Sequence, residues 1–388
     1  MSELLLGKTR MRSILIEDIT DADALKWAAL AENALEPNAF FHPAFLLRSR
    51  AAFDTVDGLR LIVVEMGDRW IALLPLTEMG RFPRTPLRYA STAGPFVGRN
   101  AALCAPLVDA NESRLAIDAL FRYLRSRQTP LPRLIELTLL PADGQLFAEL
   151  LEGCRRLGIP VQERSRFARA YARGPVDALP SAHLSAARQK QLGRLSRNLA
   201  QAAGGPLEFV DLGADPDAVL TLLDLEAAGW KGKKGSAVKM RPGLSEWFVA
   251  VTDSFRRSDA LHIFTLRAGD ATVFMSAVIK SGSIYFGILD SFDETYAKHS
   301  PGQIGRLHEL AYLLQLGDVT AFDPCMHPKY AEATALYPDR RQIVSLLIAP
   351  GWLSGLFLRA RPHLLDVRQA IVRLIGSAAA FRPEGISR

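Results

Sequence analysis

Residues 296–317 read YAKHSPGQIGRLHELAYLLQLG, and this stretch decides the fold because it joins a strand-like segment to an amphipathic helix. Ser300 is expected to cap the helix with its hydroxyl, and Pro301 has a φ angle preset for the first helical position. Gly302 keeps side-chain bulk away from the first N–H groups. Such a helix start, with bare backbone donors and the positive end of the helix dipole, suits a phosphate or pyrophosphate. Ser-Pro also opens ordinary helices, so the neighbouring sequence has to decide.

Apolar residues recur at helical spacing along this stretch and predict the buried face of the helix. That face consists of Ile304, Leu307, Ala311 and Leu314. Gln303, Arg306 and Glu309 are expected to face away from it. Gly317 follows the last apolar position and suits a C-cap.

The segments around this helix predict a sheet. Three strand-like runs, at 261–267, 272–280 and 283–290, are joined by Ala-Gly-Asp and Ser-Gly tight turns, and a fourth run follows the helix at 319–323. Antiparallel strands, a helix start suited to phosphate and a parallel strand, in this order, form the core of the GNAT acyltransferase fold.

The first half of the chain repeats this order. A helix is predicted at 21–33, a hairpin around Gly67-Asp68, a second helix at 112–127 and a strand at 134–140. Two similar halves indicate an internal duplication. The predicted class is therefore α/β, with tandem GNAT-like domains that each contain a mixed, mostly antiparallel sheet flanked by helices.

A segment rich in Pro, Gly, Ala and Ser at 174–185 marks the expected boundary. This places an N-terminal domain, which shapes the acceptor cleft, at 1–175 and the acyltransferase domain at 185–345. Residues 346–388 are expected to form a C-terminal helical tail.

Composition limits the class of protein. The 388 residues are 49% hydrophobic, enough for two cores, and the net charge of +6 does not require a nucleic acid partner. Cys104, Cys154 and Cys325 lie far apart, so neither a disulfide framework nor a metal site is expected. The N-terminus lacks a secretory signal pattern, and no apolar run reaches the length of a membrane span, which indicates a cytoplasmic protein.

One uncharged run, from Gln342 to Leu358, is broken by Pro350-Gly351 and followed by Arg359, Arg361, Arg368 and Arg373. A C-terminal pair of packing helices is expected here. Peripheral association with a membrane surface or with an assembly complex is the alternative.

Residues 185–330 resemble the GNAT-type domain of bacterial proteins associated with cellulose and exopolysaccharide biosynthesis, which are related to the Fem-type peptidoglycan aminoacyl transferases. The resemblance rests on RQKQLGRLSRNLAQAAG at 188–204, GWKGKKG at 229–235, the hairpin at 265–293 and the stretch 296–317. FFHPAFLL, WIALLPL and LCAPLVDANE also look like the first domain of that group.

The resemblance implies an N- or O-acyltransferase that uses acyl-CoA, with acetyl-CoA as the expected co-substrate and no metal. The acceptor would be an amino sugar or polysaccharide precursor. Family members usually follow the last strand with an aspartate, a glycine and a Tyr-Lys pair. FDPCMHPKY keeps Asp323 and Tyr330, but it lacks the glycine, and Lys329 precedes the tyrosine.

Acyl transfer needs a cradle for CoA, a group that accepts the acceptor's proton and an acid for the thiolate. The expected cradle uses the amides after Ser300, at Gly302, Gln303 and Ile304, with Lys298 or Arg306 adding charge. Asp323 is the first choice and Asp290 the second for the proton acceptor, although either could cap a turn. Tyr296 or His299 would supply the acid, unless His299 is a solvated loop residue.

The acceptor is expected to contact Trp230, Lys231 and Tyr330, although Trp230 could instead pack in the core. Lys231 belongs to WKGKKGSAVKM, which reads either as a solvated loop or as a flexible basic flap over an anionic ligand. Two other functions stay open. Arg188, Lys190, Arg194 and Arg197 favour a Fem-like transferase that uses aminoacyl-tRNA, and the departure at FDPCMHPKY favours an inactive scaffold or regulator of exopolysaccharide assembly.

Overall fold

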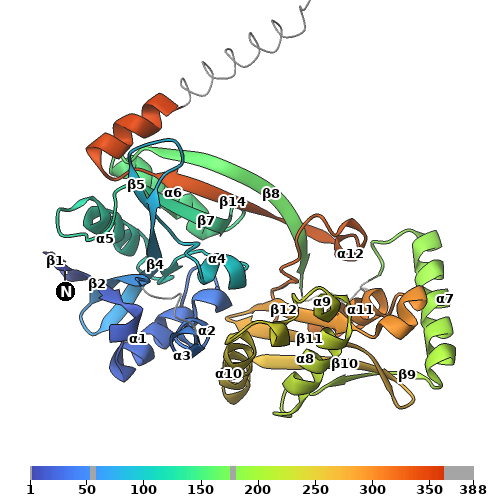
Figure 1. The fold of residues 1–388 in the computed structure, drawn as a ribbon. Helices are drawn as coiled ribbons and strands as arrows, with labels where there is room; N and C mark the ends of the chain where they lie inside the picture. The colour runs from blue at the N-terminus through green and yellow to red at the C-terminus, as the bar shows by residue number, and fades with distance from the viewer. Residues whose placement is uncertain (1, 53–57, 175–180, 362–388) are drawn as a thin grey trace, which may run out of the picture.

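The computed structural model describes residues 2–52, 58–174 and 181–361. Their strands form one mixed, mostly antiparallel sheet that runs through both halves of the chain, with helices packed on it (Figure 1). The strand order is β1-β2-β3-β4-β5-β7-β14-β8-β13-β12-β11-β10-β9, with β6 paired to β4. The predicted α/β class is thereby confirmed.

The first half of the chain supplies eight strands among the described residues: β1 (Ser2–Leu6), β2 (Thr9–Leu15), β3 (Arg60–Met66), β4 (Arg69–Arg81), β5 (Arg88–Ser91), β6 (Leu107–Val108), β7 (Ile135–Pro141) and β8 (Val161–Arg173). Its α-helices are α1 (Asp21–Glu32), α2 (Pro43–Leu46), α3 (Ser49–Ala52), α4 (Val97–Asn100), α5 (Ser113–Arg125) and α6 (Gln145–Arg156). Short 3₁₀ helices lie at Ile16–Asp18 and, as η2, at Ala39–Phe41. The predicted helices at 21–33 and 112–127 and the hairpin at Gly67-Asp68 are confirmed.

The second half supplies strands β9 (Leu207–Asp211), β10 (Leu261–Ala268), β11 (Ala271–Ser281), β12 (Ile284–Phe292), β13 (Ala321–Asp323) and β14 (Asp339–Ile348). Its α-helices are α7 (Ala186–Ala203), α8 (Ala218–Ala228), α9 (Trp230–Lys233), α10 (Leu244–Arg257), α11 (Pro301–Leu313) and α12 (Ala331–Thr334). The 3₁₀ helices η4 (Val238–Met240) and η5 (Glu294–His299) complete it.

Both halves contain the same arrangement of strands around one helix. β5 follows an antiparallel neighbour and pairs in parallel with β7, and α5 lies in the connection. β12 likewise follows antiparallel β11 and pairs in parallel with β13, with α11 in the connection. This repeat is the topology that the internal duplication predicted.

The last strand of each half is exchanged. β8, from the first half, pairs with β13 of the second half, whereas β14, from the second half, pairs with β7 of the first. β8 and β14 also pair with each other along the whole length of β14, so they bridge the two halves (Figure 1).

The prediction of two packing helices after Gln342 was wrong for its first part. Residues 339–348 form β14, and in the described part of the chain that follows it, which ends at residue 361, residues 352–361 are helical. The run QIVSLLI has no charges and reads equally well as a buried strand or a buried helix, and its two neighbouring strands decide. Arg368 and Arg373 lie outside the described residues.

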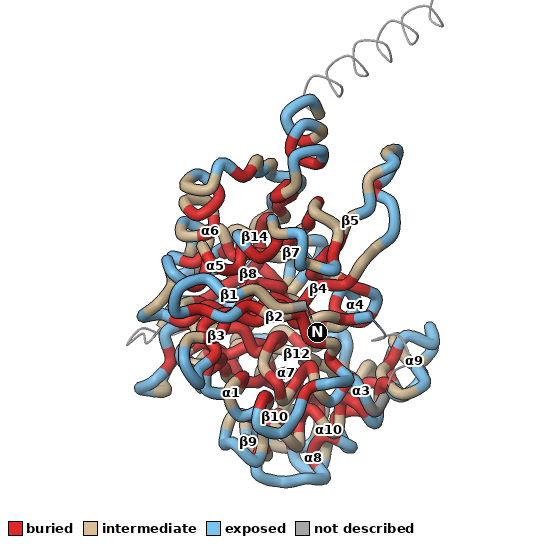
Figure 2. The backbone as a smooth tube through the Cα atoms, turned by 90° about the vertical axis from the view of Figure 1, so that its left-hand side faces the viewer, coloured by how far each residue is buried: buried red, intermediate tan, exposed pale blue. Residues whose placement is uncertain are grey.

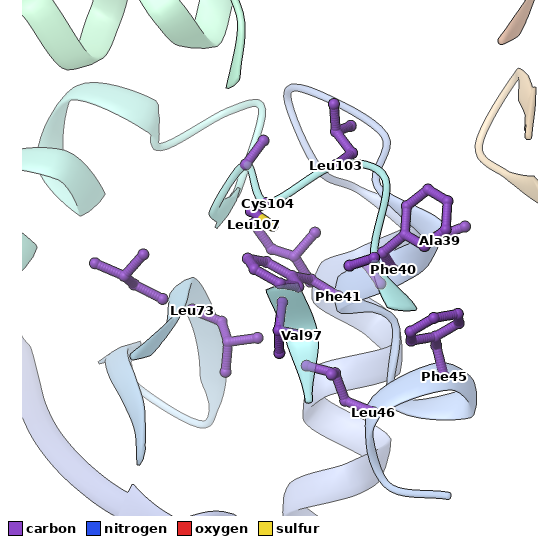
Figure 3. Packing of buried hydrophobic residues seen from close by; sticks show 14 of the residues in the cluster. Ala39, Phe40, Phe41, Phe45, Leu46, Leu73, Val97, Leu103, Cys104 and Leu107 are labelled. Carbon is purple, nitrogen blue, oxygen red and sulfur yellow. The ribbon is translucent and has the colours of Figure 1, made fainter. Parts of the chain in front are cut away.

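The main hydrophobic core crosses the boundary between the halves, which Figure 2 shows as buried backbone through the centre of the molecule. It contains residues of the first half, such as Phe40, Phe41 and Phe45 around η2 and α2 (Figure 3). Trp247 and Phe286 of the second half belong to the same core. Phe40 meets Phe286 edge to face with ring centroids 5.7 Å apart, and Phe45 meets Trp247 at 5.0 Å. The two halves therefore pack directly against each other.

Candidate active site between diverging strands

The candidate site begins where β12 and β13 separate. The two strands pair only from Ile284 to Phe286 on β12. Residues 287–292 continue along β11 alone, so an opening forms beyond the last parallel pair. Gly287 stands at its edge, where a Cβ atom would lie 3.2 Å from the carbonyl oxygen of Pro324.

A cavity of about 700 Å³ occupies this opening and is lined by both halves of the chain. Aromatic side chains form much of its wall: Phe40, Phe45, Trp230, Trp247, Phe248, Phe292 and Tyr337. Arg99 and Arg241 also line it, and both are exposed. Neither guanidinium has a hydrogen bond or ion pair with the described residues, so this cavity combines apolar walls with free positive charge.

A buried polar cluster lies where the cavity meets α11. The hydroxyl of Ser276 on β11 donates to Glu309 Oε1 at 2.6 Å, and Arg306 Nε donates to Asp290 Oδ2 at 2.6 Å. Burial raises the pKa of Glu309 to about 8, and the charge of Asp290 contributes to the rise against the opposing effects of Ser276 and Arg306. Burial also raises the pKa of Tyr337 well above its usual value of 10, helped by the charge of Glu309.

The expectation that Arg306 and Glu309 face away from the core was wrong. Glu309 is only 4% exposed, and Arg306 is half-buried in its ion pair. The helix lies so close to the sheet that a Cβ atom on Gly305 would be 2.2 Å from Phe274 Cδ1. Because α11 lies this close to the sheet, the sheet covers the helix face with Gly305 and Glu309 as well as the face with Ile304.

The start of α11 differs from the expected phosphate cradle. Ser300 adopts a left-handed conformation, with φ at 54°, and its side chain makes no cap hydrogen bond. The amides of Gln303 and Ile304 both donate to the Ser300 carbonyl, at 3.0 and 3.2 Å. Of the three expected amide donors, only that of Gly302 makes no hydrogen bond with the described residues.

The four other candidate side chains near the start of α11 differ in exposure and in their contacts. Lys298 is exposed, and Gln303 accepts a hydrogen bond from Arg188 of α7 at 2.6 Å. Tyr296 packs against the cluster that contains Ile304. His299 is half-buried, and its Nε2 atom has no hydrogen-bond partner in the described chain. None of these four side chains lines the cavity.

Asp323 does not line the cavity either. Its carboxylate is fully buried, accepts a hydrogen bond from Arg169 Nε of β8 at 3.1 Å and lies 3.6 Å from Arg341 Nη1 of β14. Arg341 also pairs with Glu36. The strands β12 and β13 are adjacent, as expected, but only Asp323 ends its strand, since β12 continues past Asp290 to Phe292. Asp290 lines the cavity, whereas Asp323 joins the exchanged strands.

All three residues expected to contact the acceptor, Trp230, Lys231 and Tyr330, line the cavity. Trp230 is 42% exposed at its rim and does not pack in the core. Lys231 Nζ donates to Glu226 at 2.9 Å.

The lysine-rich segment, for which the sequence allowed a solvated loop or a flexible basic flap, is folded as α9 and η4. Glu226 holds it through Lys231 and also accepts from the amide of Val238 at 2.8 Å. Lys233 and Lys239 pair with Glu294 and Asp224. Three of the four lysines are therefore neutralised by carboxylates, and the segment offers little free charge to a ligand.

Comparison with known proteins supports the class. Residues 186–330 match the family model described as an acetyltransferase (GNAT) domain. The protein is accordingly an acyltransferase whose second half carries a GNAT-type domain. No curated protein matches the chain.

Solved structures support the fold of nearly the whole chain. The crystal structure of FemX is 10% identical, with a TM-score of 0.53 over 85% of this chain and 96% of that one. The C-terminal domain (DUF2156) of a putative lysylphosphatidylglycerol synthetase from Agrobacterium fabrum is 12% identical, with a TM-score of 0.51 over 88% of this chain and 96% of its own. Similarity at this identity extends to the fold.

Two further features of the described residues bear on the chemistry. They contain no cluster of three or more His, Cys, Asp or Glu side chains that could hold a metal ion. Within the same ranges, no helix is both long and apolar enough to span a membrane.

The polar cluster was missed by sequence reasoning. Glu309 was assigned to the wrong face, and neither Ser276 nor Tyr337 was a candidate. Gly305, four residues before Glu309, is the signal that could have indicated a tightly covered helix face.

Proposed function

We propose that this acyltransferase moves an acyl group from an acyl-CoA, most simply acetyl-CoA, to the amine or hydroxyl of an amino sugar or polysaccharide precursor bound in the cavity. The observation that carries the proposal is the cavity between β12 and β13, which contains a buried carboxyl group with a pKa near neutrality. The GNAT-type domain makes acyl-CoA the expected donor.

Glu309 is the proposed general base. The acceptor nitrogen or oxygen attacks the thioester carbonyl, the new bond to carbon forms, the C–S bond breaks and the acceptor loses a proton. A base works best when its pKa lies near the operating pH, and the pKa of Glu309, about 8, meets this condition. Asp290, bound to Arg306, is then a positioning residue and not the primary base.

Tyr337 is the proposed acid for the departing thiolate. It lines the same cavity, and its raised pKa keeps the phenol protonated at neutral pH. This assignment takes the place of Tyr296 and His299, which lie away from the cavity.

The proposed donor site lies at the start of α11. The free amide of Gly302, the exposed Lys298 and the positive end of the helix dipole all favour an anionic group there. Phe292 connects this region to the cavity, since it lines the cavity and lies 3.0 Å from a Cβ atom built on Gly302.

The proposed acceptor is a saccharide because of the aromatic wall of the cavity. Phe40, Phe45, Trp247 and Phe248 present aromatic rings, which pack well on the apolar faces of sugars. Arg99 and Arg241 would bind a negative group on the acceptor, such as the phosphate of an activated precursor.

A second donor, aminoacyl-tRNA, is favoured by one observation. Lys190, Arg194 and Arg197 are exposed on α7 at spacings that place them on one face, and none pairs with a carboxylate in the described ranges. α7 packs beside η5 and α11, next to the proposed donor site. A basic stripe of this kind suits a nucleic acid backbone.

Calorimetric titration of acetyl-CoA into the protein tests the proposal. We expect binding to the native chain and its loss in Lys298→Glu and Gly302→Glu, because a carboxylate there repels the pyrophosphate. Gly317→Glu, four residues after the end of α11 at Leu313, is the matched control and should bind normally, because a Cβ there meets nothing within 4 Å.

The absence of acetyl-CoA binding to the native protein would contradict the proposed donor. In that case tRNA binding would support the second candidate. This binding should weaken steeply with salt and should be lost in the double variant Lys190→Glu, Arg194→Glu. Lys298→Glu changes an exposed side chain, so its result does not depend on whether Gly302→Glu folds.

A further inference from the structure

The helix at residues 352–361 has an exposed apolar face. Trp352, Leu353 and Leu356 are 72%, 54% and 55% exposed, and Arg359 and Ala360 lie on the same side. At 100° per residue these five positions cover one side of the helix. Most exposed large apolar side chains in the described chain are scattered, so three on two turns of one helix form an uncommon patch.

The opposite face of this helix is already occupied. Leu358 is buried with Phe82 and Leu134, and the hydroxyl of Ser354 donates to the carbonyl of Arg133. Phe357 meets Phe82 with ring centroids 6.0 Å apart. The helix is thus fixed on the first half of the molecule, and Figure 1 shows it at the top, beside the hairpin formed by β4 and β5. Figure 2 shows buried and exposed backbone alternating along it.

The surroundings of the patch carry surplus positive charge. The carboxylates nearby are each matched: Glu78 pairs with Arg88, Glu136 with Arg164 and Glu163 with Arg166. Four arginines remain without a carboxylate partner in the part of the chain that the structure describes: Arg81, Arg84, Arg359 and Arg361.

Two of these arginines belong to the helix and two to the hairpin tip that packs against it. Arg361 lies over the ring of Phe82 at 5.8 Å and donates only to neutral Gln162. Arg164 lies over the same ring at 5.3 Å, so two guanidinium groups contact one phenyl ring. A hollow of about 430 Å³, with Arg359 and Leu358 in its lining, opens next to the helix.

We propose that this face, formed by Trp352, Leu353 and Leu356, docks the enzyme on an anionic lipid surface. Arg359 lies on the same side of the helix, and Arg81, Arg84 and Arg361 add unpaired positive charge at the adjoining hairpin tip and helix end. An apolar strip with a tryptophan, close to unpaired arginines, matches the acyl boundary and the negative headgroups of such a surface. The charge selects lipid over a second copy of this chain, because two copies would bring eight unpaired arginines together. The inference does not depend on the donor or the acceptor, since the face lies outside the cavity.

Sedimentation with vesicles tests this inference. We expect the full-length protein to bind vesicles that contain phosphatidylglycerol and to bind those of phosphatidylcholine alone at least about tenfold more weakly, with the difference reduced by salt. Trp352→Ser with Leu356→Ser should weaken binding by at least about tenfold. Arg81→Glu with Arg84→Glu should do so without changing the apolar strip.

Matched controls lie elsewhere on the surface. Leu25→Ser removes a side chain of α1 that is 74% exposed, and Arg267→Glu reverses an exposed charge on β10; neither should change vesicle binding. Failure to bind anionic vesicles, or equal binding by the patch variants, overturns the proposal. Self-association would also overturn it. Its signature would be concentration-dependent dimers that the double variant Trp352→Ser, Leu356→Ser abolishes and the arginine variant does not.

Discussion

Glu309 illustrates how burial turns an ordinary carboxyl group into a candidate base. It lies between the sheet and α11, where only the Ser276 hydroxyl donates to it, and the neighbouring charge of Asp290 disfavours ionisation. The nearby Arg306 is engaged by Asp290 and compensates only in part. The same residue in solvent would be ionised throughout the neutral range.

The first prediction concerns activity. Glu309→Gln keeps the shape of the side chain but cannot accept a proton, so kcat should fall by about a hundredfold or more. The native enzyme should gain activity as the pH rises through about 8, and the variant should not. A pH–rate profile checks this, with Glu208→Gln on β9 as an exposed control. A variant that keeps the native profile would show that another group takes the proton.

The second prediction concerns stability. The folded-state pKa of Glu309, about 8, lies above the usual 4.5, so the unfolded chain ionises first as the pH rises. Stability should therefore fall between about pH 4.5 and pH 8 and level off above that range. Glu309→Gln removes this cost and should stabilise the fold by about 3 kcal/mol at pH 7. Urea unfolding at several pH values measures it, and a variant as pH-dependent as the native protein would contradict the assignment.

At the scale of the element, α11 performs its role because it approaches the sheet closely. Gly305 allows this, since any side chain there would overlap the ring of Phe274. The approach brings Arg306 to Asp290 and Glu309 to Ser276, and it directs the start of the helix toward Phe292. A helix lying farther out would leave these polar groups in solvent.

The third prediction compares two helical glycines. Gly305→Ala should destabilise the protein by about 1–3 kcal/mol and lower activity, because the methyl group pushes α11 off β11. Gly193→Ala on α7 should stabilise it by about 0.5–1 kcal/mol, since its Cβ would meet only Arg197 at 3.7 Å. Thermal or urea unfolding of both variants checks the difference. Equal effects would mean that helix propensity and not contact with Phe274 controls α11.

For the whole molecule, the exchange of β8 and β14 makes the two halves one folding unit. Arg169 of β8 and Arg341 of β14 converge on Asp323, at the end of β13, so the exchanged strands are tied together at the point where they enter the second half. The cavity depends on this connection, because Phe40 and Phe45 from the first half form part of its wall.

The fourth prediction separates a structural from a catalytic role for Asp323. Asp323→Asn leaves two buried arginines under-compensated and should destabilise the fold by about 3–5 kcal/mol. Glu163→Gln, which breaks an exposed pair with Arg166, should cost less than about 1 kcal/mol. Urea unfolding measures both. A stable Asp323→Asn protein without activity would restore Asp323 as the proton acceptor.

The sequence alone determined several of the elements and their order. Local signals were sufficient for α1, α5 and the β3–β4 hairpin, because apolar periodicity and Gly-Asp turn chemistry act within a few residues. Strand order around α11 was likewise readable. Five residues that the sequence singled out for the candidate site line one cavity: Trp230, Lys231, Asp290, Arg306 and Tyr330.

Only the tertiary structure decided which side chains meet. β14 is a strand because β7 and β8 supply partners from the other half, and no local pattern contains that information. The sequence did not show that the carboxyl groups of Asp323 and Glu309 have different surroundings. Two distant arginines pair with the first, and a closely packed helix gives the second a pKa of about 8, because charge and dielectric environment act through space and not along the chain.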